Sequence, residues 1–471
     1  MTVTQQLREA GREPGVPFDV ELGTDRLRVT QWLRVLPGKR LVGRGEYRGR
    51  PVLAKLFVGA SAARHAEREA AGIAALSAAG IATPGVVAQG LIEGGGNYLF
   101  TEFLAEAVTL QAKWDALPGV KPGDSEAVLL LGMALRTIAR MHAQGLLQGD
   151  LHLGNFLLAG NDLYVIDGDA VEASAPGEPL PQRQAETNLA LFFAQLTPGW
   201  DALQELLLVE YLMINPHHAL QTQRLETEVR RLRSERLNDF LGKTLRDCSQ
   251  FSVQRSWSRF TAALRSRRDS LDTLLADPDQ AFQGPLLKDG GSSTVAKCRI
   301  DGQDLLVKRY NIKGFVHWLK RFWRPSRAWH SWQAAHRLRF LGIDTPEPLA
   351  MVERRFGPFR HRAWLVTEFC PGEPLLEVLG MGADVPATDL GLAILQTFSR
   401  LREARISHGD CKATNFLWDG QRISIIDLDS LAVHSTGAAW EQAWAVDRAR
   451  FLRNWSSSSP LFNWLDEKLP R

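Results

Sequence analysis

An internal repeat constrains the fold of this chain more than any other feature of its sequence. The segment GDLHLGNFLL at 149–158 recurs as GDCKATNFLW at 409–418, and YVIDGDA at 164–170 recurs as SIIDLDS at 424–430. In both copies an Asn follows the first Asp by five residues, and a second Asp follows that Asn by twelve. Three further pairs match upstream in the same order: VLAKLF with LLVKRY, GIATP with GIDTP, and LFTEFL with LVTEFC. The separation of about 260 residues is far longer than a solenoid repeat, so we predict a duplicated domain.

Each copy has the same predicted order of elements. A strand that carries Lys55 or Lys308 is followed by a helix, at 62–79 or 326–341, which a GI-x-TP turn ends. The TEF segment is a short apolar strand, and a second helix follows it. The loop with the Asp–Asn pair then leads into an apolar strand that ends at the second Asp. This order predicts a mixed α+β fold in each copy.

A highly charged stretch at 224–246 lies between the copies. Its mixed signs favour a solvated helix or a connector over a ligand site. We place the domain boundary there, with residues 1–245 in the first domain and 246–471 in the second.

The composition narrows the class of protein. With 45% hydrophobic and 23% charged residues, the chain is an ordinary globular protein, and its formal charge of +3 gives no overall field for nucleic acid. Four scattered cysteines without a CxxC pair predict neither a disulfide framework nor a zinc site, and they favour the cytoplasm. The apolar runs are too short to span a membrane, and the first residues lack the apolar core of a signal peptide.

The repeated Asp–Asn–Asp set fits phosphoryl transfer, although Asp and Asn also favour loops for purely structural reasons. The first Asp can accept a proton from an acceptor hydroxyl or orient that hydroxyl. The Asn and the second Asp offer hard oxygen ligands for Mg²⁺ that bridges nucleotide phosphates. A lysine on an upstream strand can hold the α- and β-phosphates, and an acid on the next helix can position that lysine. The predicted metal ligands are Asn155, Asp167, Asn415 and Asp427.

Glycines near each lysine strand would let a hairpin backbone approach the phosphates. A plain hairpin turn explains each of them equally well. The glycines concerned are Gly43, Gly45, Gly290 and Gly291.

Taken together, these motifs resemble the lipopolysaccharide-core kinases, a protein-kinase-like family that phosphorylates heptose or Kdo sugars. The resemblance covers most of 285–455 and about 36–200. It implies two tandem protein-kinase-like bilobal domains with small C-lobes, which use ATP and Mg²⁺.

The resemblance also implies roles for individual residues. Asp150 and Asp410 would be the catalytic bases, and Lys55 and Lys308 would hold the ATP phosphates. The stretch Glu102, Phe103 and Leu104 would form the hinge whose backbone reads adenine. Glu69 would pair with Lys55, although a solvated helix charge is the simpler interpretation and Glu67 is a second candidate. Beside the bases, His152 and Lys412 are candidate donors to the transferred phosphate.

The second copy lacks an acid on the helix after its lysine. No Asp or Glu occurs from Leu305 through Ile343, and Ser331 stands where the first copy has Glu69. Either another acid such as Glu347 or Glu353 orients the lysine, or this copy works poorly, or it binds nucleotide without turnover. We therefore expect the second copy to turn over more slowly than the first.

The same stretch is basic and rich in tryptophan. It holds nine Lys or Arg residues together with Trp318, Trp323, Trp329 and Trp332. One interpretation is an amphipathic helix that packs on its own domain. The other is a surface for anionic lipid or glycolipid, which the family resemblance favours.

The expected function is ATP-dependent phosphorylation of a sugar hydroxyl of the lipopolysaccharide inner core. The expected partners are an anionic glycolipid or core oligosaccharide and, peripherally, the cytoplasmic face of the inner membrane, with no nucleic acid. A protein Ser/Thr kinase is disfavoured, because only 44 residues follow Asp427 and neither copy has an APE-like sequence. A kinase-fold regulator in which one copy is a pseudokinase is disfavoured by the intact Asp–Asn–Asp sets. The sequence carries no signal for an oligomeric state.

Overall fold

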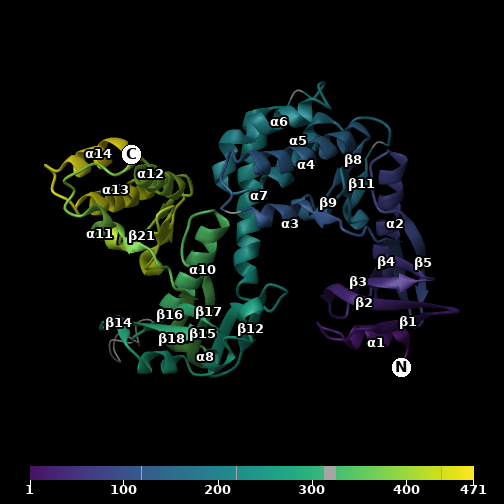
Figure 1. Cartoon of the computed structure of the whole chain (residues 1–471), viewed down its shortest axis with the longest axis horizontal. Coiled ribbons are helices and arrows are strands. Elements are labelled where there is room, and N and C mark those ends of the chain that lie inside the picture. The colour runs from purple at the N-terminus through teal and green to yellow at the C-terminus, as the bar shows by residue number, and fades with distance from the viewer. Residues whose placement is uncertain (118, 175, 219, 312–324, 436) are drawn as a thin grey trace. The chain divides into compact units, whose positions relative to one another are not determined.

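The computed structural model divides the chain into two compact units (Figure 1). Unit 1 comprises residues 1–196 and 200–233, and unit 2 comprises 197–199 and 234–471. The structure describes all residues except 118, 175, 219, 312–324 and 436. Both units contain helices and sheets, so the predicted α+β content is confirmed.

Unit 1 begins with an antiparallel sheet of six strands in the order β1-β2-β3-β4-β6-β5. Alternation of buried and exposed residues along β3 explains why this segment forms a strand with one face on a core. On β4, Lys55 pairs in register with Val42 of β3 and Leu99 of β6. The bounds are α1 Val3–Glu9, β1 Phe18–Leu22, β2 Asp25–Leu36, β3 Arg40–Tyr47, β4 Arg50–Phe57, α2 Ala62–Ala78, β5 Val86–Ile92 and β6 Gly96–Glu102.

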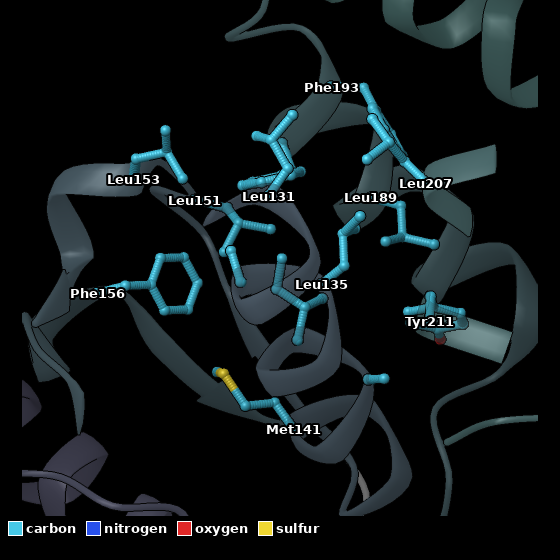
Figure 2. Close-up of a cluster of buried hydrophobic side chains, with 14 of the residues drawn as sticks. Leu131, Leu135, Met141, Leu151, Leu153, Phe156, Leu189, Phe193, Leu207 and Tyr211 are labelled. Carbon is cyan, nitrogen blue, oxygen red and sulfur yellow. The ribbon is translucent and has the colours of Figure 1, made fainter. Parts of the chain in front are cut away.

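The rest of unit 1 is mainly helical. Figure 2 shows how side chains of α4, α5 and α6 gather with Leu151 and Leu153, which lie within the first Asp–Asn loop, and with Phe156, which follows it. Burial of these apolar side chains fixes the loop on the helices. The bounds are β7 Val108–Thr109, α3 Leu110–Ala116, α4 Ser125–Ala143, β8 Leu146–Gln148, β9 Phe156–Ala159, β10 Asp162–Val165, β11 Val171–Ala173, α5 Gln182–Phe193, α6 Gln204–Leu212 and α7 Thr222–Lys243.

Unit 2 repeats this plan with a larger sheet. Its seven antiparallel strands have the order β12-β13-β17-β18-β16-β15-β14, and Lys308 lies on β16. The bounds are β12 Phe251–Arg255, β13 Arg259–Leu264, α8 Asp272–Ala276, β14 Leu286–Asp289, β15 Ser293–Ile300, β16 Gln303–Tyr310, α10 Arg327–Phe340, β17 Pro348–Phe356 and β18 Phe359–Glu368.

The C-terminal part of unit 2 surrounds its own apolar core, which includes Phe398, Phe416 and Phe451. These rings hold the second Asp–Asn loop against α12 and α13. The bounds are β19 Glu373–Pro374, α11 Leu375–Leu379, α12 Thr388–Glu403, β20 Ile406–Ser407, β21 Phe416–Trp418, β22 Ile423–Ile425, β23 Ala432–Val433, α13 Ala438–Leu452 and α14 Pro460–Lys468.

The GI-x-TP turns have the same structural role in both units. Gly80 and Gly342 adopt φ angles of 70° and 71°, in the left-handed region that favours glycine. These glycines follow the ends of α2 and α10 and stop each helix. After each turn, a backbone oxygen accepts a hydrogen bond from the strand before the second Asp. In unit 1 the N–H of Val165 donates to Ala82, and in unit 2 the N–H of Ile425 donates to Asp344. The repeated motif therefore ties each early helix to the loop of its unit.

Helix α7 differs from the solvated helix that its charges predict. Residues 222–233 belong to unit 1 and 234–243 to unit 2, so the helix does connect the units. One side of it is buried, at every fourth position: Leu225, Val229, Arg233, Leu237 and Leu241. The buried Arg233 is satisfied by two bonds to Asp201, of 2.7 and 2.8 Å. The prediction of a solvated helix is wrong for this face. Apart from Arg233, apolar residues recur at every fourth position there, although most other residues of the helix are polar or charged.

Two of the four tryptophans in the basic stretch belong to the interior of unit 2. Trp332 is fully buried, and its indole N–H donates to the backbone oxygen of Thr244. Trp329 packs against Phe260 with ring centroids 5.0 Å apart. For these two residues the interpretation as packing on their own domain holds. Trp318 and Trp323 lie outside the described residues.

Among the described residues, no helix combines the length and the apolar character that crossing a membrane requires.

Candidate active sites

Three charged side chains singled out in the sequence meet in unit 1. The Nζ atom of Lys55 lies 2.5 Å from Oε1 of Glu69 and 3.3 Å from Oδ1 of Asp167. Lys55 and Glu69 are buried, whereas Glu67 is exposed. The sheet, α2 and the loop after the apolar strand thus meet at one lysine.

The helical period explains why Glu69 faces inward. It shares the buried stripe of α2 with Ala62, Ala66, Ile73 and Leu76. Its carboxylate also accepts hydrogen bonds from the backbone N–H groups of Gly168 and Asp169, of 3.0 and 3.2 Å. A Cβ atom on Gly72 would lie 2.0 Å from the backbone oxygen of Gly168, so glycine permits this close approach. Glu69 therefore holds both the lysine and the loop.

The second Asp of each copy has the same unusual backbone. Asp167 and Asp427 adopt φ angles of 68° and 58°, in the left-handed region that residues other than glycine rarely occupy. In each unit a short 3₁₀ turn follows directly. Such strained conformations cluster at functional sites.

The Asp–Asn loops are also closed in the same way. The side-chain amides of Asn155 and Asn415 donate to the backbone oxygens of Asp150 and Asp410, at 2.6 and 2.8 Å. The Asn backbone oxygens accept from the residues before Asp167 and Asp427, at 3.0 and 2.9 Å. Since the amide N–H₂ is used in the loop, the amide oxygen is the end of each Asn that can serve a metal ion.

A side chain just before each Asp–Asn loop contacts the backbone near the second Asp. Gln148 donates to the backbone oxygen of Asp167, and His408 lies 3.0 Å from the backbone oxygen of the residue before Asp427. Asp447 on α13 accepts from the backbone N–H groups of His408 and the next residue. The sequence analysis missed Asp447, whose only signal is an acid on the helix that follows the loop.

Unit 2 holds its lysine by a different acid. Nζ of Lys308 lies 2.6 Å from Oδ1 of Asp427 and 2.9 Å from Oδ1 of Asp429. The same oxygen of Asp429 accepts from the hydroxyls of Tyr310 and Ser331, at 2.9 and 3.0 Å. Ser331 stands at the position of Glu69, and its hydroxyl contacts Asp429, the acid that pairs with the lysine in unit 2.

The two acids considered in the sequence analysis are engaged elsewhere. Glu347 pairs with Arg339 at 3.0 Å, and the buried Glu353 pairs with Arg355 at 2.6 Å. Of the alternatives left open by the sequence, the structure therefore favours another acid beside Lys308, and this acid is Asp429 and neither of the two named examples. Asp429 lies 121 residues after Lys308 in the chain, so no local pattern in the sequence links the two residues.

The pKa values of two groups in this cluster support the observed hydrogen bonds. Burial raises the pKa of Asp427, but the charge and hydrogen bond of Lys308 outweigh it, so the net shift is downward and the carboxylate stays charged. Burial, together with the charge of Asp429, raises the pKa of Tyr310 well above its usual value. Tyr310 is therefore a stable hydrogen-bond donor to Asp429.

The first Asp of each copy has different surroundings in the two units. The Asp150 side chain is 64% exposed, and Nε2 of His152 lies 3.6 Å from it. The Asp410 side chain is 29% exposed and pairs with Arg450 at 2.8 Å and Lys412 at 3.1 Å. Arg450 comes from α13 and was not predicted.

The glycines of the first copy serve strand packing. Gly43 and Gly45 lie within β3 and not in a turn, contrary to the hairpin-turn interpretation. Cβ atoms there would lie 2.8 Å from the backbone oxygens of Gln31 and Arg28 on β2. Bulges in β2 bring its backbone this close.

The glycines of the second copy do lie in a hairpin. Gly290 and Gly291 connect β14 to β15, and Gly290 donates to the backbone oxygen of Ser293 at 3.1 Å. The side chain of Asn311 donates to the backbone oxygen of Gly290 at 3.0 Å. This bond ties the hairpin to the end of β16, the lysine strand.

The TEF segment forms the end of β6, with Phe103 as the first residue after the strand. Glu102 is exposed and accepts from the backbone N–H of Gly85 at 3.1 Å. The guanidinium of Arg44 lies 4.7 Å from the centroid of the Phe103 ring. The backbone oxygen of Leu104 accepts from Ala107 at 3.4 Å.

The donor set in each unit suits a metal that is bound together with phosphates. Within the described part of the chain, no three His, Cys, Asp or Glu side chains gather as a ready metal site. Each unit offers one carboxylate and one amide oxygen, joined by the backbone bond between their segments. Mg²⁺ commonly binds one or two carboxylates and takes its remaining ligands from phosphates and water. The residues present fit such an ion.

The comparisons with known proteins agree with the family resemblance. Residues 275–453 match the model of the Lipopolysaccharide kinase (Kdo/WaaP) family. A 3-deoxy-D-manno-octulosonic acid kinase of Vibrio cholerae serotype O1 is 28% identical over 123 residues, which is 26% of this chain and 50% of that protein. The chain thus spans about half the length of this curated relative. The resemblance predicted from the sequence is confirmed for this part of the second copy.

Solved structures overlap the chain only in part. WaaP in complex with acyl carrier protein gives a TM-score of 0.33 at 22% identity, covering 44% of this chain and 88% of that one. The PknI kinase domain of Mycobacterium tuberculosis gives 0.25 at 19% identity, covering 35% and 70%. Vaccinia related kinase 3 gives 0.27 at 11% identity, covering 36% and 57%.

Proposed function

We propose that this chain is an ATP-dependent phosphotransferase that acts on a sugar hydroxyl of the lipopolysaccharide inner core. In this proposal each unit is a bilobal kinase-like domain, with the sheet part as the N-lobe and the helical part as a small C-lobe. One observation carries the proposal: a strand lysine lies within 3.3 Å of the loop aspartate in unit 1 and within 2.6 Å in unit 2. One nucleotide triphosphate bridges groups arranged in this way.

The residues of the chain have separate tasks in this mechanism. Lys55 and Lys308 bind the α- and β-phosphates, and the acids beside them keep each ammonium group in place. Asp150 and Asp410 orient the sugar hydroxyl and accept its proton as the oxygen attacks the γ-phosphorus atom. The bond from this phosphorus to the β,γ-bridging oxygen breaks, and ADP leaves.

A bound Mg²⁺ would be held by Asn155 and Asp167 in unit 1 and by Asn415 and Asp427 in unit 2, and it would neutralise charge on the phosphates. The remaining work of the protein is positioning, which accounts for most of the catalysis in phosphoryl transfer.

The expected reason for unequal copies no longer stands, because Lys308 has an acid in Asp429. We therefore propose that both units bind Mg·ATP. The remaining difference lies at the base. The Asp410 side chain is 29% exposed and is bound by Arg450 and Lys412, whereas the Asp150 side chain is 64% exposed, so a sugar hydroxyl reaches Asp150 more easily. Slower turnover in unit 2 is proposed on this ground instead. Because ATP is the phosphate donor, the reaction is proposed to take place in the cytoplasm.

The test is ATP turnover with delipidated core oligosaccharide by the full chain and by the Asp167→Asn, Asp427→Asn and double variants. We expect the double variant to lose turnover and Asp167→Asn to lose the larger share. Turnover that survives the double variant would refute the site. Phosphorylation of casein but of no sugar would instead support the protein-kinase alternative.

The proton-accepting role has its own test. Asp150→Asn, made in the Asp427→Asn background, should keep Mg·ATP binding in unit 1 and lose about 10²-fold or more in turnover. Unchanged turnover would mean that Asp150 is not the base.

A further inference from the structure

Aromatic side chains are exposed at one end of the unit 2 sheet. Trp257 lies in the turn between β12 and β13 and is 68% exposed. Phe356 and Phe359 flank the turn between β17 and β18, and Phe356 is 69% exposed. We call these three residues the aromatic tip. Large apolar side chains gathered on a surface mark interaction sites more often than single ones do.

The two turns of the aromatic tip are joined to each other. The backbone N–H of Arg355 donates to Ser258 at 2.8 Å, and that of Gly357 donates to Trp257 at 2.9 Å. The rings of Trp257 and Phe356 meet edge to face, with centroids 6.1 Å apart. A Cβ atom on Gly357 would lie 2.8 Å from the indole, which therefore packs directly over this glycine. The aromatic tip is a braced platform and not a pair of loose loops.

The segments that carry the aromatic tip are rich in arginine. Residues 254–260 and 353–362 contain six arginines and one acid, Glu353, which gives a formal charge of +5 with His361 neutral. Glu353 is fully buried and contacts Arg355 and Arg360, so it presents no charge to a partner. The whole chain carries only +3, so positive charge is concentrated here. The six arginines are Arg255, Arg259, Arg354, Arg355, Arg360 and Arg362.

Acids of neighbouring elements reduce this charge without reversing it. Asp277 and Asp279 lie 3.9 and 4.0 Å from Arg354. When both aspartates are included, the formal charge of the two segments falls from +5 to +3. Arg255 and Arg362 are exposed at its sides.

We propose that the aromatic tip docks on the surface of an anionic phospholipid membrane. Tryptophan and phenylalanine rings insert at the boundary between headgroups and acyl chains, and arginines bind lipid phosphates beside them. Charge complementarity selects this occupant, because exposed aromatic rings in segments with exposed arginines match an apolar layer beneath anionic headgroups. The docking rests on these contacts alone and holds whether or not the chain is a sugar kinase.

The position of the aromatic tip suits a reaction near a membrane. Leu365 on β18 pairs in register with Lys308, and Phe359 lies six residues further along the same strand. At about 3.3 Å per residue, Phe359 lies roughly 20 Å along β18 from the position that pairs with Lys308. A membrane contact there would keep the unit 2 site close to substrates that are anchored in lipid.

The experiment measures binding of the full chain to vesicles. Vesicles of phosphatidylcholine with one quarter phosphatidylglycerol are compared with vesicles of phosphatidylcholine alone by co-sedimentation. The test variants are Trp257→Ser/Phe356→Ser and Arg255→Glu/Arg362→Glu. The control is Met381→Ser, a substitution at another exposed apolar residue of unit 2. Thermal unfolding checks that all variants fold.

We expect the unaltered chain to bind the anionic vesicles at least tenfold more tightly than the neutral ones. Both tip variants should lose at least tenfold in this binding, and Met381→Ser should keep it. No binding of the unaltered chain, or equal binding by the tip variants, would overturn the proposal. Analytical ultracentrifugation tests the competing occupant. If the tip variants turn a dimer into a monomer and leave vesicle binding unchanged, the aromatic tip is an interface between copies of the chain.

Discussion

Replacing Asp429 by asparagine tests how unit 2 positions its lysine. The change removes a negative charge 2.9 Å from Nζ of Lys308 and leaves the volume of the side chain almost unchanged. The oxygen that accepts from Lys308 also accepts from Tyr310 and Ser331. An amide oxygen can still accept from these hydroxyls, so the charge is the main loss.

The expected magnitude follows from burial and distance. The Lys308 and Asp429 side chains are only 13% and 18% exposed, so solvent screens their attraction weakly. A hydrogen bond to a charged group contributes about 1.5–3 kcal/mol. Asp427 still holds the lysine at 2.6 Å, so we expect the lower end of this range. Such a loss corresponds to about tenfold weaker binding of Mg·ATP.

The assay is calorimetric titration of Mg·ATP into variants in which one unit is disabled. Asp429→Asn is made in the Asp167→Asn background, so that only unit 2 binds. The control is Asp169→Asn in the Asp427→Asn background, because Asp169 pairs with His65 at 2.8 Å while Lys55 pairs with Glu69. The affinity for Mg·ATP should fall when Asp429→Asn is added and should stay the same when Asp169→Asn is added. If both changes lower the affinity equally, or if Asp429→Asn does not lower it, Asp429 does not take the place of the helix glutamate in unit 2.

Three further predictions concern stability and the loops. Glu69→Ala should destabilise unit 1 by about 3 kcal/mol or more in urea denaturation, because it leaves a buried lysine short of one partner. The exposed Glu67→Ala should change little, and equal effects would contradict the pairing. Asp447→Ala leaves two backbone N–H groups of the unit 2 loop without their acceptor, at about 1–3 kcal/mol each. Turnover by unit 2 should then fall more than its affinity for Mg·ATP, and the opposite order in a kinetic assay would contradict this role. Burial lowers the pKa of His142 to about 4 and of His336 to about 3. Because these histidines take up protons only on unfolding, each unit should lose stability as pH falls from about 6.5 towards these values, by about 1.4 kcal/mol per pH unit for each histidine. Denaturation between pH 7 and 5 measures this slope, and His336→Leu should flatten it in unit 2 alone.

The repeat, the order of elements and the local placement of several site residues can be predicted from the amino-acid sequence. The helix expected at 62–79 is Ala62–Ala78 in the structure, and the one expected at 326–341 is Arg327–Phe340. Such bounds are readable because helical periodicity and a terminating glycine act over a few neighbouring residues. The same periodicity puts Glu69 on the buried stripe of its helix. The matched spacing of the Asp–Asn–Asp sets likewise reflects one loop geometry used twice.

The partners that these residues take depend on how distant segments of the chain pack together. Asp429 replaces the helix glutamate, Arg450 reaches Asp410, and Trp332 becomes core and not surface. Each of these outcomes depends on segments far apart in the chain, 121 residues in the case of Lys308 and Asp429. Local propensity carries no information about such distances. They are set by how the sheet, the helices and the loops bury their apolar faces together, and a charged side chain then pairs with whichever opposite charge that packing brings within reach.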